Sequence, residues 1–177
     1  MSTSGVSVTE DQVVTAIRSF VLSNLPSGVE CAKAQENRVA EPLADNFILM
    51  TPYMRKRLGW DVETYDEVTN VSKIQYSEPV QMEVQLDFHG ANSTDYAQTI
   101  ATLFRSSYAV AYFDGVCSPL YSDDGHQLPF INGEGQYETR WVVNLALYAN
   151  IVVSVDAQFM NSAKVQTIIA ADVEYPA

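Results

Sequence analysis

The sequence predicts an α+β fold: a mixed, largely antiparallel sheet with two helices packed on one face and an extended arm. Residues 80–89 alternate strictly between apolar and polar side chains, which is typical of a strand with one buried face. Residues 97–111 then repeat apolar side chains every three or four positions, as one long helix on that face would. At 177 residues the chain is long enough for a core, and we expect a single domain over 1–177.

The N-terminal part supplies the other helix and two strands. Thr9 to Gln12 has the form of a capping box, which marks the start of a helix. The apolar stripe of this helix consists of Val13, Ile17, Phe20, Val21 and Leu25, and the sequence Pro-Ser-Gly at 26–28 ends it. A short strand is expected near 29–35. The compact apolar run at 47–50 predicts a central strand that is buried on both faces.

Residues 52–73 lack clear periodicity and predict an arm, in the form of a loose hairpin that leaves the body. The segment combines three basic residues with two aromatic ones, a composition found at protein interfaces; these candidate interface residues are Arg55, Lys56, Arg57, Trp60 and Tyr65. The alternative is a solvated loop. Phe130 and Ile131, in a loop with exposed-looking apolar residues, are the other interface candidates, unless that loop is tucked under the sheet.

The remaining elements complete the sheet. Pro79 lacks an N–H, so a strand that begins before it should be at an edge or a bulge there. A second long strand begins at Tyr137, and we expect it to pair antiparallel with the strand at 80–89. Residues 165–175 predict a last strand, in which Ile169, Ala171, Val173 and Tyr175 share a face.

Composition excludes several classes of function. Ten basic residues against 22 acidic ones give a net charge of −12, which repels nucleic-acid phosphate and anionic membranes. The N-terminus has no signal-peptide pattern, and no apolar run is long enough to span a membrane, so we expect an intracellular product. Cys31 and Cys117 have no metal or redox spacing, and each is expected to be a buried free thiol.

Catalytic and metal-binding constellations are weak in this sequence. Asp87, His89 and Ser93 match a hydrolase triad in composition only, because Asp87 and His89 lie side by side on the polar face of one strand. Residues 123–126, Asp-Asp-Gly-His, lack the ligand spacing of a calcium or zinc site and predict a solvated turn. We therefore predict no catalytic residue, no metal and no cofactor.

Several motifs resemble a bacteriophage family, the neck or tail terminator proteins of contractile-tailed phages and prophages. The most specific are residues 84–90 with 92–93, and the run at 97–105. Further matching segments are 25–30, 35–39 with 41–42, 50–52, 119–124, 129–134, 137–138 and 140–141. The resemblance covers nearly the whole chain.

This resemblance implies a structural virion protein without enzymatic activity or cofactor. It implies a ring, usually of six copies, that caps the tail tube and joins the tail to the neck, after assembly in the host bacterial cytoplasm. Expected partners are further copies of the chain, the tail tube protein, the sheath and a neck or connector protein, while genomic DNA passes without specific binding. Two alternatives stay open: a head-completion or stopper ring, and a small hydrolase that uses the face with Asp87 and His89.

Overall fold

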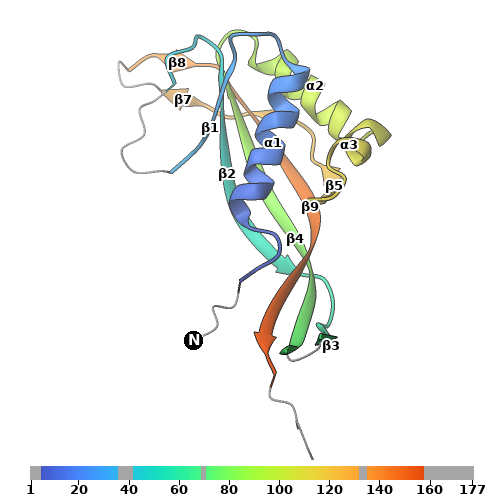
Figure 1. Ribbon diagram of the computed structural model, residues 1–177. Coiled ribbons are helices and arrows are strands. Elements are labelled where there is room, and N and C mark those ends of the chain that lie inside the picture. The colour runs from blue at the N-terminus through green and yellow to red at the C-terminus, as the bar shows by residue number, and fades with distance from the viewer. Residues whose placement is uncertain (1–4, 36–41, 69–70, 132–134, 158–177) are drawn as a thin grey trace, which may run out of the picture.

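The computed structural model describes residues 5–35, 42–68, 71–131 and 135–157, with the backbone alone at 66–68 and 71–72. The helices in these ranges are α1 (Glu10–Asn24), α2 (Ser93–Phe104) and α3 (Ser107–Tyr112). The strands are β1 (Glu30–Lys33), β2 (Phe47–Arg57), β3 (Val62–Val68), β4 (Val71–His89), β5 (Ser118–Ser122), β6 (His126–Gln127), β7 (Phe130–Ile131), β8 (Tyr137–Glu138) and β9 (Arg140–Asp156). The expected α+β class is confirmed, with three helices instead of two (Figure 1).

A mixed sheet in the order β1-β2-β4-β9-β5 forms the framework of the molecule. Among the described strands, β1 and β2 are the one parallel pair; β2, β4, β9 and β5 are antiparallel neighbours. The predicted pairing of the two long strands is confirmed, because β4 and β9 stay in register from Lys73 opposite Asp156 to His89 opposite Arg140. The small strands β7 and β8 form a separate hairpin. The long β4–β9 ladder therefore runs the full length of the sheet.

All three helices lie on one face of the upper sheet, the end that contains His89 (Figure 1). The predicted capping box is present: the Thr9 N–H donates to Gln12 Oε1 at 2.8 Å, and the Gln12 N–H donates to Thr9 Oγ1 at 3.2 Å. The alternating apolar residues of β4 face these helices and are buried, namely Val80, Met82, Val84, Leu86 and Phe88. The core of the molecule thus sits between the helices and the upper half of the sheet.

The single long helix expected from the repeat at 97–111 is wrong in one respect, because the helix breaks between α2 and α3. The Arg105 side chain donates hydrogen bonds to the Ser122 carbonyl and hydroxyl, and its guanidinium pairs with Asp124 at 2.8 Å. Ser106 Oγ donates to the Leu103 carbonyl at 2.6 Å, a local bond that competes with the helical pattern. These contacts tie the chain to β5 where the helix would otherwise have continued.

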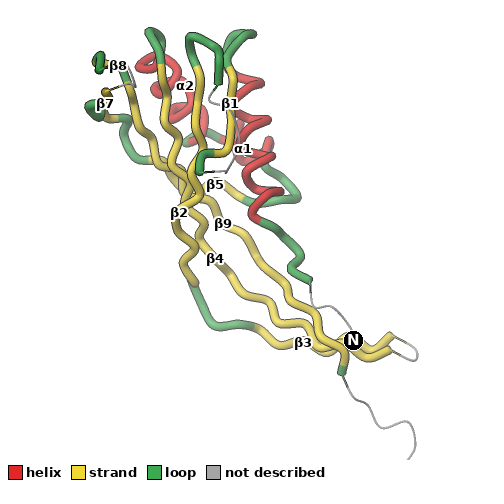
Figure 2. Tube along the Cα trace, turned by 90° about the vertical axis from the view of Figure 1, so that its left-hand side faces the viewer, coloured by secondary structure: helices red, strands yellow, loops and turns green. Residues whose placement is uncertain are grey.

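The lower sheet forms the arm, which extends beyond the helices (Figure 2). The expected short strand (β1) and central strand (the start of β2) are confirmed, but β2 continues to Arg57 and enters the arm. There β3 pairs with the first part of β4, so the arm contains a hairpin of residues 62–68 with 71–77, which extends beyond the expected 52–73. The expectation that this segment lacks regular elements is wrong. Its periodicity is poor because residues 53–58 and 60–65 are exposed whichever face they lie on.

Pro79 lies where β4 exchanges one neighbour for another. The β2 ladder ends with Arg57 opposite Val80, and the β3 ladder begins with Val62 opposite Ser77. The Pro79 carbonyl accepts from the Leu58 N–H at 2.9 Å on that side. In an antiparallel strand the N–H and C=O of one residue point the same way, so the missing N–H faces the gap between the ladders. The edge expected at Pro79 therefore exists only on the side of β4 that faces β2 and β3, because β9 pairs with β4 on the other side.

The strand predicted at 165–175 lies outside the described residues.

Candidate functional site

The predicted interface residues fall at opposite ends of the molecule. Arg55, Lys56, Arg57, Trp60 and Tyr65 belong to the arm, whereas Phe130 and Ile131 form β7 beside the upper end of β4. Tyr65 is opposite Ile74 in the sheet, while the Phe130 ring contacts His89. Fifteen residue steps of β4 separate these two points, roughly 50 Å along the strand. The structure therefore shows two separate surfaces.

Arg57 holds the turn between β2 and β3 together. Its guanidinium donates to the Gly59 carbonyl at 2.7 Å and forms ion pairs with Asp61 and, at 3.4 Å, with Glu78. It also lies 5.4 Å from the ring centroid of Trp60. Arg57 thus braces the arm internally, and its charge is already matched within the chain.

Arg55 and Lys56 are exposed, and neither forms an ion pair with any residue that the structure describes. Their side chains leave opposite faces of β2, because Arg55 is opposite Met82 on the helix side and Lys56 is opposite Gln81 on the other face. Trp60 is 87% exposed and Tyr65 69% exposed. We call Arg55, Lys56, Trp60 and Tyr65 the arm surface. Unpaired cations next to uncovered aromatic rings suit an acidic protein partner.

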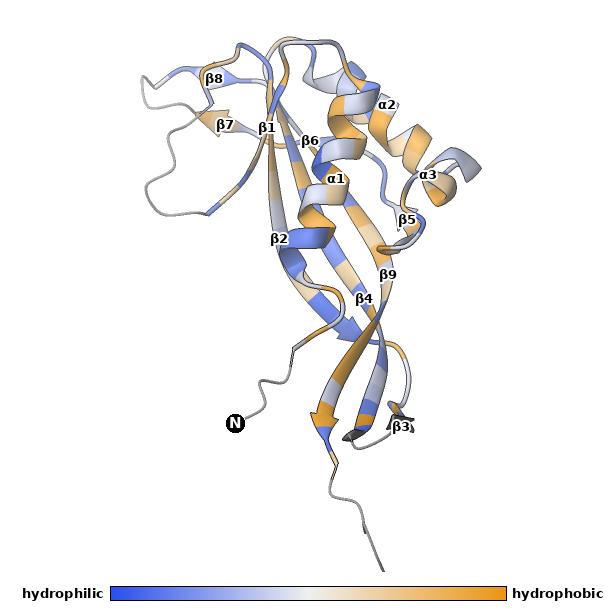
Figure 3. Cartoon of the chain, viewed as in Figure 1, coloured by the Kyte–Doolittle hydropathy of each residue, from blue (hydrophilic) through white to orange (hydrophobic). Residues whose placement is uncertain are grey.

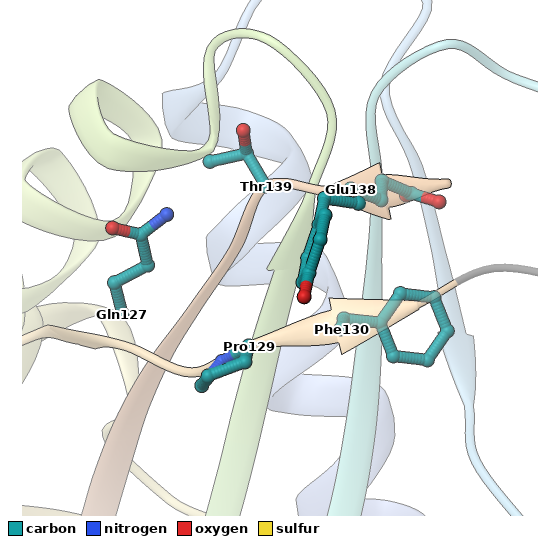
Figure 4. A pocket seen from close by; sticks show the side chains of 6 residues that line it. Gln127, Pro129, Phe130, Glu138 and Thr139 are labelled. Atoms are coloured by element: carbon teal, nitrogen blue, oxygen red, sulfur yellow. The ribbon is translucent and has the colours of Figure 1, made fainter. Parts of the chain in front are cut away.

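The upper surface is the β7–β8 hairpin (Figure 4), and contacts with His89 and Arg140 hold it in place. The Phe130 ring meets His89 edge-to-face at 5.2 Å between centroids, and the Arg140 guanidinium lies 6.0 Å above Phe130. His89 also stacks on Phe47 at 4.5 Å, and its Nδ1 lies 3.3 Å from a carboxylate oxygen of Glu138. Phe130 is therefore an anchor that faces the body, whereas Ile131 is exposed.

A pocket of about 360 Å³ lies at this hairpin, lined by Gln127, Pro129, Phe130, Tyr137, Glu138 and Thr139 (Figure 4). Tyr137 is 83% exposed and was missed by sequence reasoning. The sequence pattern predicts one continuous strand that begins at Tyr137, but that strand is interrupted at Thr139 between β8 and β9. We call Ile131, Tyr137 and this pocket the hairpin surface.

Asp87 and His89 support the hairpin and do not assemble a triad. Asp87 accepts from Arg140 Nη2 at 2.9 Å and from Gln85 Nε2 at 2.9 Å, while His89 is only 4% exposed. Ser93 Oγ is buried and has no hydrogen-bond partner among the described residues. Ser93 is the first residue of α2, and Asn92 occupies the N-cap position of that helix. No observation here favours the hydrolase alternative.

The segment at 123–126 is tied to the body. The Asp123 carboxylate accepts from the Asn144 backbone N–H and from Asn144 Nδ2, both at 2.6 Å, and Asp124 pairs with Arg105. Within the ranges that the structure describes, no three His, Cys, Asp or Glu side chains gather as metal ligands would. The two carboxylates therefore serve as local connections between β5, β9 and α2.

The sheet face opposite the helices is polar. Tyr53 donates its hydroxyl proton to Glu83 at 2.6 Å, and Gln81 donates to the same carboxylate at 2.7 Å. Burial, followed by this hydrogen bond to Glu83, raises the pKa of Tyr53, so the phenol stays neutral. We call this the open face, because the helices all cover the other side of the sheet (Figure 1).

The two cysteines are buried free thiols, as expected. Burial raises the pKa of Cys31 to about 12 and that of Cys117 to about 11. Neither thiol is therefore suited to act as a nucleophile or metal ligand at neutral pH.

Comparison with known proteins assigns the chain to a family. No described helix is both long enough and apolar enough to cross a membrane. No curated protein matches the chain. A family model described as phage neck terminator protein matches residues 11–172, which is nearly the whole chain and includes the arm, the hairpin and the open face. The chain therefore belongs to the family of phage neck terminator proteins.

Proposed function

We propose that this protein is a tail terminator: copies of it form a ring, a hexamer as is usual in such proteins, that caps the tail tube and joins the tail to the neck and head. The family match over residues 11–172 carries this proposal. A member of this family is a virion component whose partners are other phage tail and neck proteins. Assembly takes place in the host bacterial cytoplasm before the tail joins the head.

The separation of the two surfaces supports a ring. A closed ring needs a heterologous interface, in which each copy presents two different patches. The arm surface offers unpaired cations and aromatic rings, while the hairpin surface offers Tyr137, Ile131 and the carboxylate of Glu138. Because these patches differ in chemistry and lie at opposite ends of β4, one copy can use both at once. If the copies contact one another through other residues, these two patches are available for the tail tube, the sheath or the neck connector.

The open face is our candidate for the wall of the central channel. It contains polar groups of Gln81, Glu83 and Gln85, and the chain as a whole carries a net charge of −12. Like charge weakens contact with the phosphates of DNA, so the genome passes through such a channel without specific binding.

The direct test is to mix the purified protein with tail tubes and image the product by electron microscopy. The terminator proposal expects rings at tube ends, with tubes of the length found in the native particle. Binding to the portal or adaptor ring, with bare tube ends, would instead identify a stopper or head-completion protein.

Single charge reversals in the arm test which of its faces takes part in assembly. Arg55→Glu changes the helix side and Lys56→Glu changes the open face, and neither removes an ion pair within the described chain. We expect at least one of them to reduce ring or cap formation about tenfold or more, with unfolding curves unchanged. Lys73→Glu is the matched control, since Lys73 is an exposed cation farther along the arm. If both variants assemble as the control does, Arg55 and Lys56 belong to a solvated surface.

A further inference from the structure

The short helix α3 presents an exposed surface without charge. Ala109 and Phe113 face the core and are at most 1% exposed, so the opposite side of α3 faces outward. Around that side, Tyr108 is 46% exposed, Val110 56% and Tyr112 36%. Residues 106–113 contain no charged side chain, and Figure 3 shows hydrophobic residues along this helix. In a chain with 22 acidic residues, such a surface is suited to contact with another protein.

Contacts with α1 and β5 hold α3 in a fixed position. The Phe20 ring of α1 lies 6.1 Å from the Tyr108 ring and 5.3 Å from the Tyr112 ring, measured between centroids. The Tyr112 hydroxyl shares a hydrogen bond of 3.1 Å with Ser23 Oγ, which is also on α1. Just before the helix, Arg105 is tied to β5 as described above. Both tyrosines are therefore positioned before a partner arrives, which lowers the entropic cost of binding.

A second copy of the chain is the occupant that this chemistry favours. Each copy carries a net charge of −12, so two copies repel one another wherever their acidic surfaces approach. Contact through an uncharged helix avoids most of that repulsion and buries apolar area. A basic partner would instead be attracted to the acidic surfaces, because residues 106–113 offer it no carboxylate.

The hairpin surface of the same chain complements α3. It contains the pocket of about 360 Å³, and beside that pocket Tyr137 is 83% exposed and Ile131 57% exposed. α3 is a ridge on the helix layer that carries two tyrosines, whose hydroxyls can donate hydrogen bonds. Glu138, in the lining of the pocket, is an acceptor for such a bond. An uncharged ridge thus faces a hollow of suitable chemistry when two copies meet.

The two surfaces lie on different sides of the molecule but at the same end of it. Figure 1 shows α3 near β5 on one side of the upper sheet and the hairpin on the other. A ring requires two different patches on opposite sides of each copy. The hairpin surface and α3 meet that condition without a displacement along β4. The arm surface, by contrast, lies roughly 50 Å from the hairpin along that strand.

We propose that α3 of one copy packs against the hairpin surface of the next copy around the ring. This inference rests on the ring proposed above and identifies the contact between its copies. It leaves the arm surface for the tail tube, the sheath or the neck connector.

Two charge variants of the full-length chain test the contact by complementation. Ala111→Asp changes an exposed residue on the outward side of α3, and Tyr137→Asp changes the hairpin. Each variant alone has one defective half of every contact, so its self-association in sedimentation velocity should be at least about tenfold weaker than that of the natural chain. In an equimolar mixture, the intact α3 of one variant meets the intact hairpin of the other once. We therefore expect a two-copy complex that does not grow further.

Val62→Asp is the matched control, because Val62 is 58% exposed in the arm and takes no part in the proposed contact. An equal loss in this control would attribute the defect to the added charge alone. Normal self-association of Ala111→Asp would remove α3 from the interface. Pairs formed by Tyr137→Asp alone would show that two α3 surfaces contact each other across a two-fold axis. Each of these results overturns the proposal, as does the absence of a two-copy complex in the mixture.

A cross-link separates this contact from the terminator proposal. A benzophenone side chain at position 137, irradiated with and without tail tubes, should react with residues 106–113 of another copy. Tube-capping rings whose cross-links lie elsewhere would overturn the α3 contact and leave the terminator proposal standing. Cross-links to α3 in a protein that does not cap tubes would retain the contact and overturn the terminator proposal.

Discussion

The two halves of β4 differ in what covers them, although both are built in the same way. Residues 80–89 and 73–79 continue one strand, pair with β9 throughout and alternate between two faces. Above Pro79 the helix-side residues are fully buried, and below it they are half-buried. The comparison separates two physical requirements: backbone pairing suffices to make a strand, but burial of apolar area supplies most of the stability. We call the three helices and the upper sheet the body. The body should therefore supply most of the free energy of unfolding, and the arm should be available for contacts with other segments or molecules.

The largest expected effect comes from matched truncations in the two halves of this strand. Phe88→Ala removes a ring that is 0% exposed and should lower the free energy of unfolding by about 3–5 kcal/mol. Tyr76→Ala, on the same face within the arm, should cost about 1–2 kcal/mol because its ring is only half-buried. Urea unfolding followed by circular dichroism measures both. Equal losses would show that the arm is as integral to the folded core as the body.

Next in size is the ion pair that supports the upper hairpin. Asp87→Ala leaves the partly buried Arg140 without its carboxylate partner, and we expect a loss of about 2 kcal/mol in unfolding free energy. Glu63→Ala, which removes an exposed carboxylate of the arm, should cost less than about 0.5 kcal/mol. Urea unfolding compares the two variants. A loss from Glu63→Ala that matched the loss from Asp87→Ala would contradict the division between body and arm.

The two cysteines make the free energy of unfolding depend on pH, with an effect similar in size to that of Asp87→Ala. Both thiols stay protonated when folded, since burial raises their pKa from 9.0 to about 12 for Cys31 and about 11 for Cys117. Above pH 9 the unfolded chain loses protons that the folded chain keeps, so stability falls as the pH rises. From pH 9 to 10 the two thiols together should remove about 2 kcal/mol.

Unfolding curves at pH 8, 9 and 10 measure this slope. A Cys31→Ala/Cys117→Ala variant is the comparison, and its stability should fall less steeply over the same range. The measurements stop at pH 10. Above that pH the raised pKa of Tyr53 would also lower the free energy of unfolding and would be confused with the effect of the thiols. If the stability of the natural chain and of the double variant fell equally steeply with pH, the thiols would not be the cause of the pH dependence.

The smallest expected change in stability is at the most exposed aromatic residue of the arm. Trp60→Ala should alter the unfolding free energy by less than about 1 kcal/mol, since its ring is 87% exposed and contacts Arg57 at the surface. Its effect on ring assembly or tube capping should be much larger, which sedimentation and electron microscopy would detect. A large loss of stability with normal assembly would reverse the roles assigned to the two regions.

Sequence patterns predicted the body better than the arm for a physical reason. In the body, one-sided burial enforces alternation, so the strand at 80–89 and its partner from Tyr137 onward were both recognisable. In the arm, residues 53–58 and 60–65 are exposed on either face, and β3 therefore left no periodic signal. The break between α2 and α3 depends on Arg105 reaching Ser122, a tertiary contact that no local pattern contains.

The candidate surfaces show the same limit. Residue type alone selected Arg55, Arg57 and Phe130, but it could not distinguish the unpaired cation from the one that Asp61 neutralises. Nor could it show that Phe130 faces His89 while Tyr137 faces solvent. To distinguish a buried anchor such as Phe130 from an exposed contact residue such as Tyr137, one must know which strands are neighbours. The local sequence does not contain that information.

The uninterrupted register between β4 and β9 has a mechanical consequence. From Lys73 opposite Asp156 to His89 opposite Arg140, one antiparallel ladder connects the arm to the strand end that supports the upper hairpin. Tension along this axis loads the cross-strand hydrogen bonds in shear, so many bonds resist together and do not open one after another. The ladder thus behaves as a stiff beam, and a displacement imposed at one end of the molecule is transmitted to the other with little extension.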